Sequence, residues 1–224
     1  WGGRKLRRWL QRQGIDAVPS ASTITSILRR HGLLSPANPR PVAVGSFEAE
    51  APNDLWQLDF MGDRPLGCGT VYPFSVLDDH SRFALTLIAG ENKQFQPVQE
   101  QLIACFRQYG LPARILSDNG PPWGSSGQRG LTRMEAWWVQ LGITVSHGRF
   151  YHPQTQGKVE RWHGTLSRDV FARGQPDDHA HCQQVFDAFR SIYNLERPHD
   201  ALELEVPASR YQPSPRPYPE VLPP

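Results

Sequence analysis

Hydrophobic positions recur at helical spacing near the start of the chain. Leu6, Trp9 and Leu10 fall on one face of a predicted first helix. Ser20 is placed to cap a second helix, whose apolar face carries Ala21, Ile24, Ile27 and Leu28. The pattern therefore predicts two short, consecutive helices within residues 1–34.

After residue 50 the pattern changes to short apolar runs that alternate with longer helical segments. Strands are predicted over residues 55–62, 70–78, 82–90, 112–120 and 143–148, and helices over residues 95–110, 133–142, 157–171 and 181–198. Three strands in succession, followed by strand–helix crossovers, predict an α/β fold with a mixed sheet flanked by helices.

Proline-rich stretches divide the chain. We expect a helix-turn-helix segment over 1–34, a linker over 35–50, a core over 51–203 and an extended tail over 204–224. The start at Trp1 instead of Met suggests that the first segment is truncated.

Length and cysteine usage narrow the class of protein. The chain has 224 residues, and no apolar run approaches the length of a membrane span. No leader peptide is visible at its start. Its three cysteines lie far apart and include no CxxC pair, which argues against a disulfide framework or a structural zinc finger and favours a reducing compartment.

Charge is distributed unevenly. Residues 1–46 hold eight basic side chains and one acidic side chain, a net charge of +7, whereas the rest of the chain sums to −5. A basic head on a mildly acidic body is typical of a module that binds a polyanion. A solvated basic helix is the alternative.

The second predicted helix has a face suited to DNA. Small polar side chains near its start can reach base edges, and arginines near its end can contact phosphates. Half of an ordinary helical hairpin is the alternative. The candidate DNA-binding residues of the head are Ser22, Thr23, Ser26, Arg29 and Arg30, together with Arg4, Lys5, Arg7 and Arg8.

Three acidic residues occupy unusual positions in the core. Asp59 lies inside an apolar run, Asp118 ends the fourth strand, and Glu160 lies in the first turns of a helix. If the first and fourth strands are neighbours, Asp59 and Asp118 meet at one edge of the sheet. Three converging carboxylates repel one another unless cations bind them, and oxygen-only ligands suit Mg²⁺ or Mn²⁺.

Each carboxylate also has a structural alternative. Asp59 could accept a hydrogen bond at a strand end, and Asp118 in SDNG could form an Asx-turn. Glu160, beside Lys158 and Arg161, could belong to a solvated helix surface. The combined pattern favours a metal site more strongly than any single member does.

Four segments together resemble a known family. NDLWQLDF (53–60), VLDDHSR (76–82), ILSDNG (115–120) and HPQTQGKVERWHGTL (152–166) are similar, in order and spacing, to the integrase catalytic core of DDE transposases. The likeness is greatest to bacterial insertion-sequence transposases of the group typified by the IS481 family, which belong to the retroviral-integrase superfamily.

The resemblance implies a ribonuclease-H-like fold and a polynucleotidyl transferase. It assigns Asp59, Asp118 and Glu160 as catalytic residues and as ligands of two Mg²⁺ or Mn²⁺ ions. Such an enzyme nicks element ends and transfers the 3′-hydroxyl to target DNA, as a homo-oligomer on double-stranded DNA, in the bacterial cytoplasm at the nucleoid and not at a membrane.

Further residues near the third carboxylate are candidates for DNA contact. Between Asp118 and Glu160 lie 41 residues, a few more than is common in the family, which fits a Gly-rich insertion over 121–130. Gln156, Lys158 and Arg161 are predicted to contact DNA. Asn119, His152 and His163 are possible auxiliary residues, although packing or loop roles suit both histidines.

Other conspicuous side chains are interpreted as structural. DDHSR fits a hairpin turn in which Arg82 pairs with an aspartate. The sequence HAHC (179–182) has no fourth ligand at suitable spacing for zinc. Trp137 and Trp138 are adjacent, so one is expected in the core and the other partly exposed.

Two other functions compete with an active transposase. One is a catalytically silent DNA-binding regulator derived from a transposase. The other is a simple ribonuclease-H-type nuclease, which would cleave RNA–DNA hybrids without joining strands.

Overall fold

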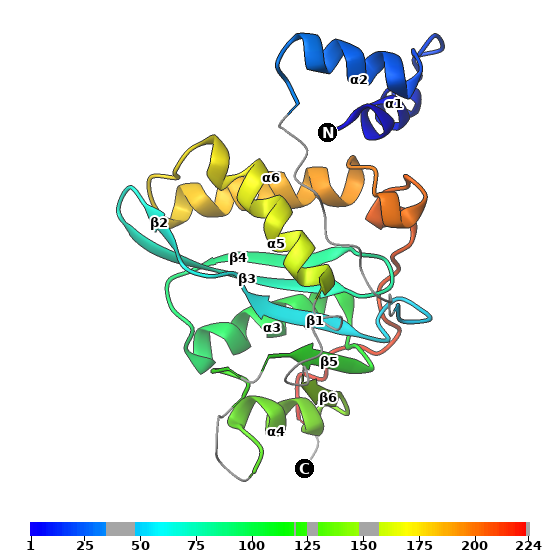
Figure 1. Cartoon of the computed structure of the whole chain (residues 1–224). Helices are drawn as coiled ribbons and strands as arrows, with labels where there is room; N and C mark the ends of the chain where they lie inside the picture. The colour runs from blue at the N-terminus through cyan, green and yellow to red at the C-terminus, as the bar shows by residue number, and fades with distance from the viewer. Residues whose placement is uncertain (35–47, 119, 125–129, 148–156, 223–224) are drawn as a thin grey trace.

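The computed structural model of the chain describes residues 1–34, 48–118, 120–124, 130–147 and 157–222. Its centre is a six-stranded mixed sheet with helices on both faces, and a pair of helices lies at one end of the molecule (Figure 1). The predicted mixed sheet flanked by helices is confirmed.

Antiparallel strands form one half of the sheet. β3 (Gly69–Asp78) pairs with β1 (Trp56–Phe60) and with β4 (Ala84–Gly90), both in antiparallel orientation. A short strand, β2 (Arg64–Leu66), also pairs with β3. Sequence analysis missed β2 because three residues are too few to show a period.

Parallel pairing builds the other half. β5 (Arg114–Ser117) lies beside β1, and β6 (Thr144–His147) lies beside β5, both in parallel orientation. The crossover from β4 to β5 passes through helix α3 (Phe95–Tyr109), and that from β5 to β6 through α4 (Arg133–Gln140). The predicted adjacency of the first and fourth strands is therefore correct.

Two apolar clusters hold the helices against the two faces. On one face, Trp56, Leu58 and Phe74 pack with side chains of α3 and α4. On the other, α5 (Gly157–Asp169) and α6 (His179–Leu195) cover Leu77, Leu87 and their neighbours (Figure 1). Short 3-10 turns complete the chain: η1 (Phe171–Arg173), η2 (Asp200–Leu202) and η3 (Pro207–Ser209).

Residues Asp78–Ser81 form the predicted turn between β3 and β4. The Asp78 carboxylate accepts hydrogen bonds from the Ser81 amide and hydroxyl and from the Asn53 amide. Arg82 contacts an aspartate of this turn, as predicted, but through the backbone: its guanidinium donates to the Asp79 carbonyl and also to the Glu48 carboxylate.

The core encloses more of the chain than the sequence pattern indicates. Trp137 and Trp138 are both buried, because α4 is enclosed by the sheet, α3 and the C-terminal residues, so the expected exposure of one of them is wrong. The tail after η3 lies against this core, where Tyr211 stacks on Phe83 with 4.4 Å between ring centroids.

The helices of the head are α1 (Gly3–Arg12) and α2 (Ala21–Arg30), which pack against each other. Ser20 caps α2 as predicted, since its hydroxyl accepts from the Thr23 amide. None of the helices described is both long enough and apolar enough to cross a membrane.

Candidate active site at the carboxyl ends of β1 and β5

Strand register brings Asp59 and Asp118 to one edge of the sheet. Trp56 pairs with Ile115 across the parallel strands β1 and β5, and each aspartate comes three residues after one member of that pair. Side chains alternate along a strand, so Asp59 projects away from Leu58 and toward the face that α5 covers. Asp118 lies one residue beyond β5, and its negative charge acts on Asp59. Segments that are far apart in the sequence thus place two carboxylates side by side.

Helix α5 adds the third carboxylate. Glu160 lies in the first turn of α5 and is exposed, and its negative charge acts on Asp59. The N-terminal end of a helix carries a partial positive charge, which favours an anionic side chain there. The three acidic residues predicted from the sequence therefore face one region of the molecule.

Electrostatics single out Asp59. Burial, followed by the negative charges of Asp118 and Glu160, raises the pKa of Asp59 from 3.8 to about 7, against smaller opposing effects that include the charge of Lys93. A carboxyl group in this state gains from any cation that replaces its proton. The positive charges of the protein near this edge are therefore too few to balance its carboxylates.

The carboxylates do not form a closed cage. Among the residues described, no three acidic, histidine or cysteine side chains lie close enough together to hold an ion. Asp118 Oδ1 accepts from the Gly120 amide at 3.1 Å, which is the Asx-turn considered as an alternative, and from the Trp123 indole at 2.6 Å. The donor set nevertheless suits Mg²⁺ or Mn²⁺ in chemical type, because all of its ligand atoms are carboxylate oxygens.

His163 lies on the same face of α5 as Glu160, as its spacing predicts. Its Nδ1 is 3.6 Å from Asp59 Oδ2, and its Nε2 is 2.9 Å from the Ser75 hydroxyl. Burial, and secondarily the charge of Arg64, lowers the pKa of His163 to about 4, so the ring is neutral near pH 7. His163 thus ties α5 to β3 beside the first carboxylate.

Sequence comparison agrees with this geometry. Two family models, each described as an integrase core domain, match residues 49–153 and residues 141–207. The chain belongs to the integrase core family. It is therefore a member of the polynucleotidyl transferase superfamily, of the transposase and integrase type.

Relatives of this integrase core occur in insertion elements and retroviruses. An uncharacterized 31.7 kDa protein of insertion element IS407 from Burkholderia multivorans is 25% identical over 214 residues, which cover 93% of this chain and 74% of that protein. The Gag-Pol polyprotein of baboon endogenous virus is 28% identical over 173 residues, 75% of this chain but only 10% of the polyprotein. The chain thus spans a small part of such viral relatives.

Solved structures share the fold. The intasome of simian T-cell lymphotropic virus, solved with a PP2A regulatory subunit, aligns with a TM-score of 0.60 at 20% identity, covering 92% of this chain and 72% of the viral chain. The HTLV-2 integrase catalytic core, solved with magnesium in a trimeric form, gives 0.56 at 15% identity over 74% of this chain and 100% of its own. The ribonuclease-H-like integrase fold is thereby confirmed.

One predicted DNA contact of the integrase core is wrong. Lys158 is buried, and its Nζ lies 2.5 Å from Asp79 Oδ2 and 3.0 Å from the Asp79 carbonyl. Asp79 also accepts from the Gln57 side chain at 2.6 Å. Since this pair links α5 to the turn between β3 and β4 inside the protein, the Lys158 charge is engaged within the fold.

Basic residues of α1 are also engaged. Arg4 and Lys5 approach the Asp200 carboxylate at 3.6 and 3.2 Å, and Arg8 pairs with Glu205. Arg7 is exposed, as is the whole predicted DNA face of α2, made up of Ser22, Thr23, Ser26, Arg29 and Arg30. Three basic side chains of α1 are therefore paired with carboxylates, whereas the predicted DNA-binding side chains of α2 are exposed.

Other predicted site residues vary in their surroundings. Arg161 is exposed and its side chain donates to the Gly157 carbonyl. Asn119, His152 and Gln156 lie outside the described residues. Of the HAHC segment, His181 approaches Asp177 at 3.1 Å, whereas Cys182 is buried in the core beneath α6.

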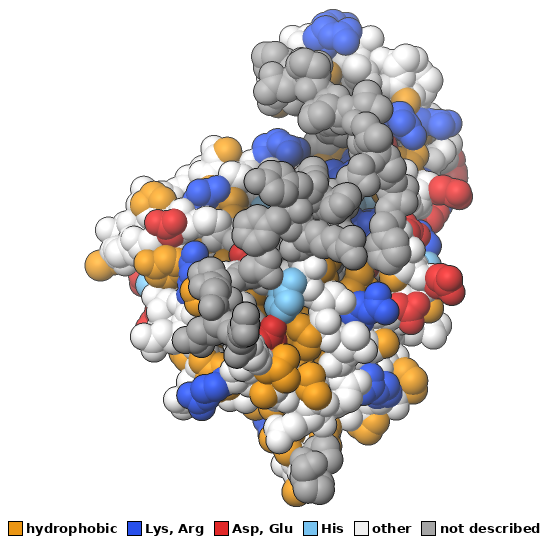
Figure 2. All heavy atoms as spheres, turned by 60° about the horizontal axis from the view of Figure 1, so that its bottom comes forward, with side chains coloured by type: hydrophobic (Ala, Val, Ile, Leu, Met, Phe, Trp, Pro, Cys, Tyr) orange, Lys and Arg blue, Asp and Glu red, His pale blue; other side chains and the backbone are white. Residues whose placement is uncertain are grey.

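Figure 2 shows lysine and arginine side chains spread around one face of the molecule, with hydrophobic side chains between them.

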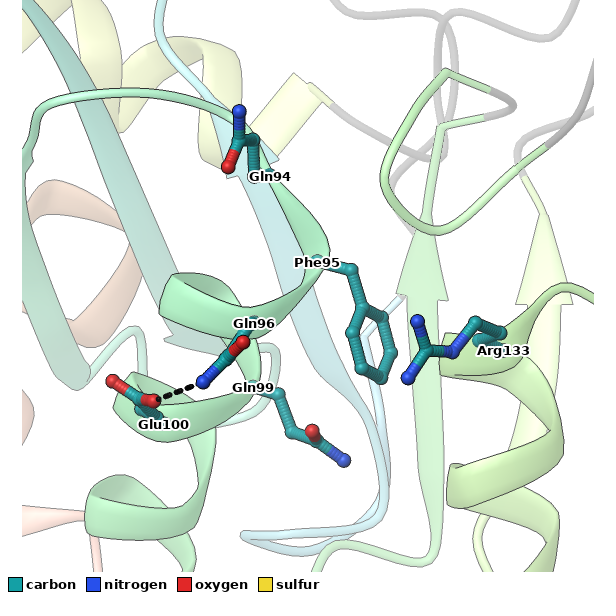
Figure 3. Close-up of a pocket in the computed structure, with 6 residues that line it drawn as sticks. All are labelled: Gln94, Phe95, Gln96, Gln99, Glu100 and Arg133. Carbon is teal, nitrogen blue, oxygen red and sulfur yellow. Dashed lines mark hydrogen bonds between the residues drawn. The ribbon is translucent and has the colours of Figure 1, made fainter.

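A separate hollow of about 360 Å³ lies between the first turns of α3 and α4, where the Arg133 guanidinium stands over the Phe95 ring at 4.4 Å (Figure 3). Its lining includes glutamines and only one acidic residue, Glu100, so it is not the carboxylate site.

Several residues beside the carboxylates carry no signal in the sequence. Lys93 stands over the rings of Phe60 and Tyr72, at 5.5 and 5.4 Å, and its charge acts on Asp59. Trp123 and His147 contact Asp118 through its carboxylate and its carbonyl. These residues lie in loops or at element ends, where no hydrophobic period reveals them.

Proposed function

We propose that this integrase core is a DDE transposase that cleaves one strand at the end of an insertion element and joins the freed 3′-hydroxyl to target DNA. The observation that carries the proposal is the arrangement of Asp59 and Asp118 on adjacent parallel strands, with the charge of Glu160 acting on the same site. The raised pKa of Asp59 supports a site that is completed by a cation.

Asp59, Asp118 and Glu160 would hold two Mg²⁺ or Mn²⁺ ions. Bound there, the ions would activate a hydroxyl nucleophile and stabilise the leaving oxygen of a phosphodiester. The solved HTLV-2 core contains magnesium, which agrees with this assignment. A cation would also remove the repulsion that raises the pKa of Asp59.

Side chains around the carboxylates would position the substrate. Neutral His163 fixes α5 against β3, and this keeps Glu160 over the acidic edge. Lys93, held over two aromatic rings at that edge, is placed to meet a backbone phosphate. Arg161 lies on the exposed side of α5 next to Glu160 and remains a proposed DNA contact.

The exposed face of α2 would recognise the ends of the element. Thr23 and Ser26 can reach base edges, while Arg29 and Arg30 can pair with phosphates. One solved structure that shares this fold is an intasome, and one form of the HTLV-2 core is trimeric. We therefore propose that the protein acts as a homo-oligomer on double-stranded DNA, at the bacterial nucleoid in the cytoplasm.

Nicking of a duplex that carries the element end tests the proposal. The unaltered protein should nick with Mg²⁺ and not with EDTA, and Asp118→Asn should lower the rate at least about 100-fold while leaving DNA affinity within about threefold. Asp63→Asn is the matched control, because Asp63 is exposed between β1 and β2. Nicking by Asp118→Asn at the unaltered rate would refute the proposal.

Two alternative functions give different results in the same assay. A silent DNA-binding regulator would bind element ends without nicking them, and the lack of a closed cage among the described residues is the observation in its favour. A ribonuclease-H-type nuclease would cleave RNA–DNA hybrids and would join no strands.

A further inference from the structure

Trp123 connects the two strand-end carboxylates through its position in the core. Its side chain is 1% exposed, and its ring stacks on Phe60 with 5.2 Å between centroids and 19° between planes. It also contacts Phe74, which pairs with Phe60 across the strands β1 and β3. Since Phe60 directly follows Asp59, the indole is held by the strand that carries the first carboxylate.

The same indole holds the second carboxylate. Trp123 Nε1 donates to Asp118 Oδ1 at 2.6 Å, and the Gly120 amide donates to that oxygen at 3.1 Å. Among the hydrogen bonds of the described residues, none reaches Asp118 Oδ2. One carboxylate oxygen is therefore retained by the protein while the other remains for a ligand.

A ring of hydrogen bonds supports this contact. The Thr132 hydroxyl donates to the Trp123 carbonyl at 3.0 Å, and Thr132 forms a reciprocal cap with Glu135 at the start of α4. Glu135 Oε1 lies 2.5 Å from His147 Nε2, and His147 Nδ1 lies 3.3 Å from the Asp118 carbonyl. Thr132, Glu135 and His147 thus form a hydrogen-bonded frame that links the Asp118 backbone to Trp123, and the Trp123 indole holds the Asp118 side chain.

Glu135 is the acidic member of this frame, and its contacts favour the charged form. Burial alone would raise the pKa of Glu135, but hydrogen bonds from Thr132 and His147 outweigh it and hold that pKa below 4.5. Glu135 therefore stays anionic and keeps its partners near neutral pH.

We propose that Trp123 is a positioning residue for Asp118: its indole N–H orients the carboxylate so that the second oxygen can bind a divalent cation. The inference rests on the proposed function, because it assumes that Asp118 is a ligand. Outer partners that orient a ligating group typically contribute about 10–100-fold to metal affinity or activity. No sequence period marks Trp123, since it lies within the insertion at residues 121–130.

Binding of Mn²⁺ alone to the full chain, measured by water-proton relaxation, tests the inference. Trp123→Phe removes the N–H and keeps an aromatic ring, and it should weaken Mn²⁺ binding about 10-fold or more. Trp138→Phe is the matched control, because Trp138 is equally buried in the same cluster and its Nε1 has no hydrogen-bond partner among the described residues. The control should bind Mn²⁺ within about twofold of the unaltered protein.

A second measurement uses the unaltered protein. In a ¹⁵N-labelled sample, the indole N–H signal that disappears in Trp123→Phe should shift when Mg²⁺ is added, and the Trp138 signal should stay in place. Asp118→Ala should move the Trp123 signal without metal, because the acceptor is lost. If Trp123→Phe fails to fold, the Trp123 indole signal is assigned directly in the unaltered protein, and its response to Mg²⁺ and to Asp118→Ala tests the inference.

The outcomes separate this inference from the proposed function. Unchanged Mn²⁺ affinity in folded Trp123→Phe, or an indole signal that ignores both Mg²⁺ and Asp118→Ala, would overturn the positioning role alone. Failure of the unaltered protein to bind Mn²⁺, or full binding by Asp118→Asn, would overturn the proposed function and this inference with it.

Discussion

Single residues in this protein owe their chemistry to their neighbours. Asp59 resembles any aspartate in a strand until β5 and α5 place two further carboxylates against it. Lys158 resembles a surface lysine until it pairs with Asp79, which also accepts from Gln57, and burial is then the largest effect in lowering the pKa of Lys158 to about 8. Neither environment is visible in the local sequence.

Asp59 should make stability depend on pH in the absence of metal. Its folded pKa of about 7 exceeds the ordinary 3.8, so its contribution to stability is present below about pH 4 and lost as pH rises through 7. The full shift would correspond to about 4 kcal/mol, and partial exposure reduces this to roughly 2 kcal/mol. Asp59→Asn should therefore be more stable than the unaltered protein at pH 8 in EDTA, and should lack this pH dependence.

Urea unfolding at pH 5 and pH 8 measures the effect. The groups that face Asp59 are Asp118 from β5, Glu160 and His163 from α5, and Lys93. Added Mg²⁺ should restore stability to the unaltered protein at pH 8 and have little effect on Asp59→Asn. Equal pH dependence in both proteins would show that Asp59 is not under-neutralised.

At the scale of elements, α5 is the least predictable part of the site. The period of its apolar residues predicts a helix, but the angle at which it crosses the sheet depends on two polar anchors, Lys158 on Asp79 and His163 on Ser75. Glu160 lies between these anchors along the helix. The position of the third carboxylate thus depends on buried polar contacts in addition to apolar packing.

Breaking the Lys158–Asp79 pair should destabilise the fold strongly. Lys158→Met leaves a buried, unpaired carboxylate, which costs about 3–5 kcal/mol, and the double variant with Asp79→Asn should cost less than the sum of the two single variants. Chemical denaturation of the four proteins measures the coupling. Arg107→Met is the control, because its partner Glu220 is exposed and the loss should be small. Purely additive effects would contradict a buried, coupled pair.

The whole molecule combines the integrase core with a helical head. Acidic residues after α6 bind α1 through Asp200 and Glu205, so much of the positive charge of the head is compensated inside the chain. The net charge of +7 in residues 1–46 therefore overstates what DNA would meet. The exposed arginines of α2 are the larger remaining source of attraction.

Two matched double variants should separate the roles of the head helices. Arg29→Ala with Arg30→Ala should weaken DNA binding about 10-fold at physiological salt and reduce the salt slope by roughly 2, because two phosphate contacts are lost. Arg4→Ala with Lys5→Ala removes the same charge, yet should change affinity much less, since both side chains approach Asp200. Fluorescence anisotropy with a labelled duplex at several salt concentrations measures both, and equal losses would contradict the distinction.

Local pattern was enough to predict the order of the longer helices and strands, the turn at residues 78–81 and the choice of three candidate carboxylates, because these depend on neighbours within a few positions and on motifs in the chain. Tertiary structure alone decided that Lys158 faces Asp79, that Arg4 and Lys5 meet Asp200, and that Trp123 holds Asp118. Those contacts join residues whose separation in the sequence carries no period. Such residues meet only because α5 packs against the sheet, α1 against the residues after α6, and Trp123 against Phe60, with the burial and charge pairing that this packing imposes.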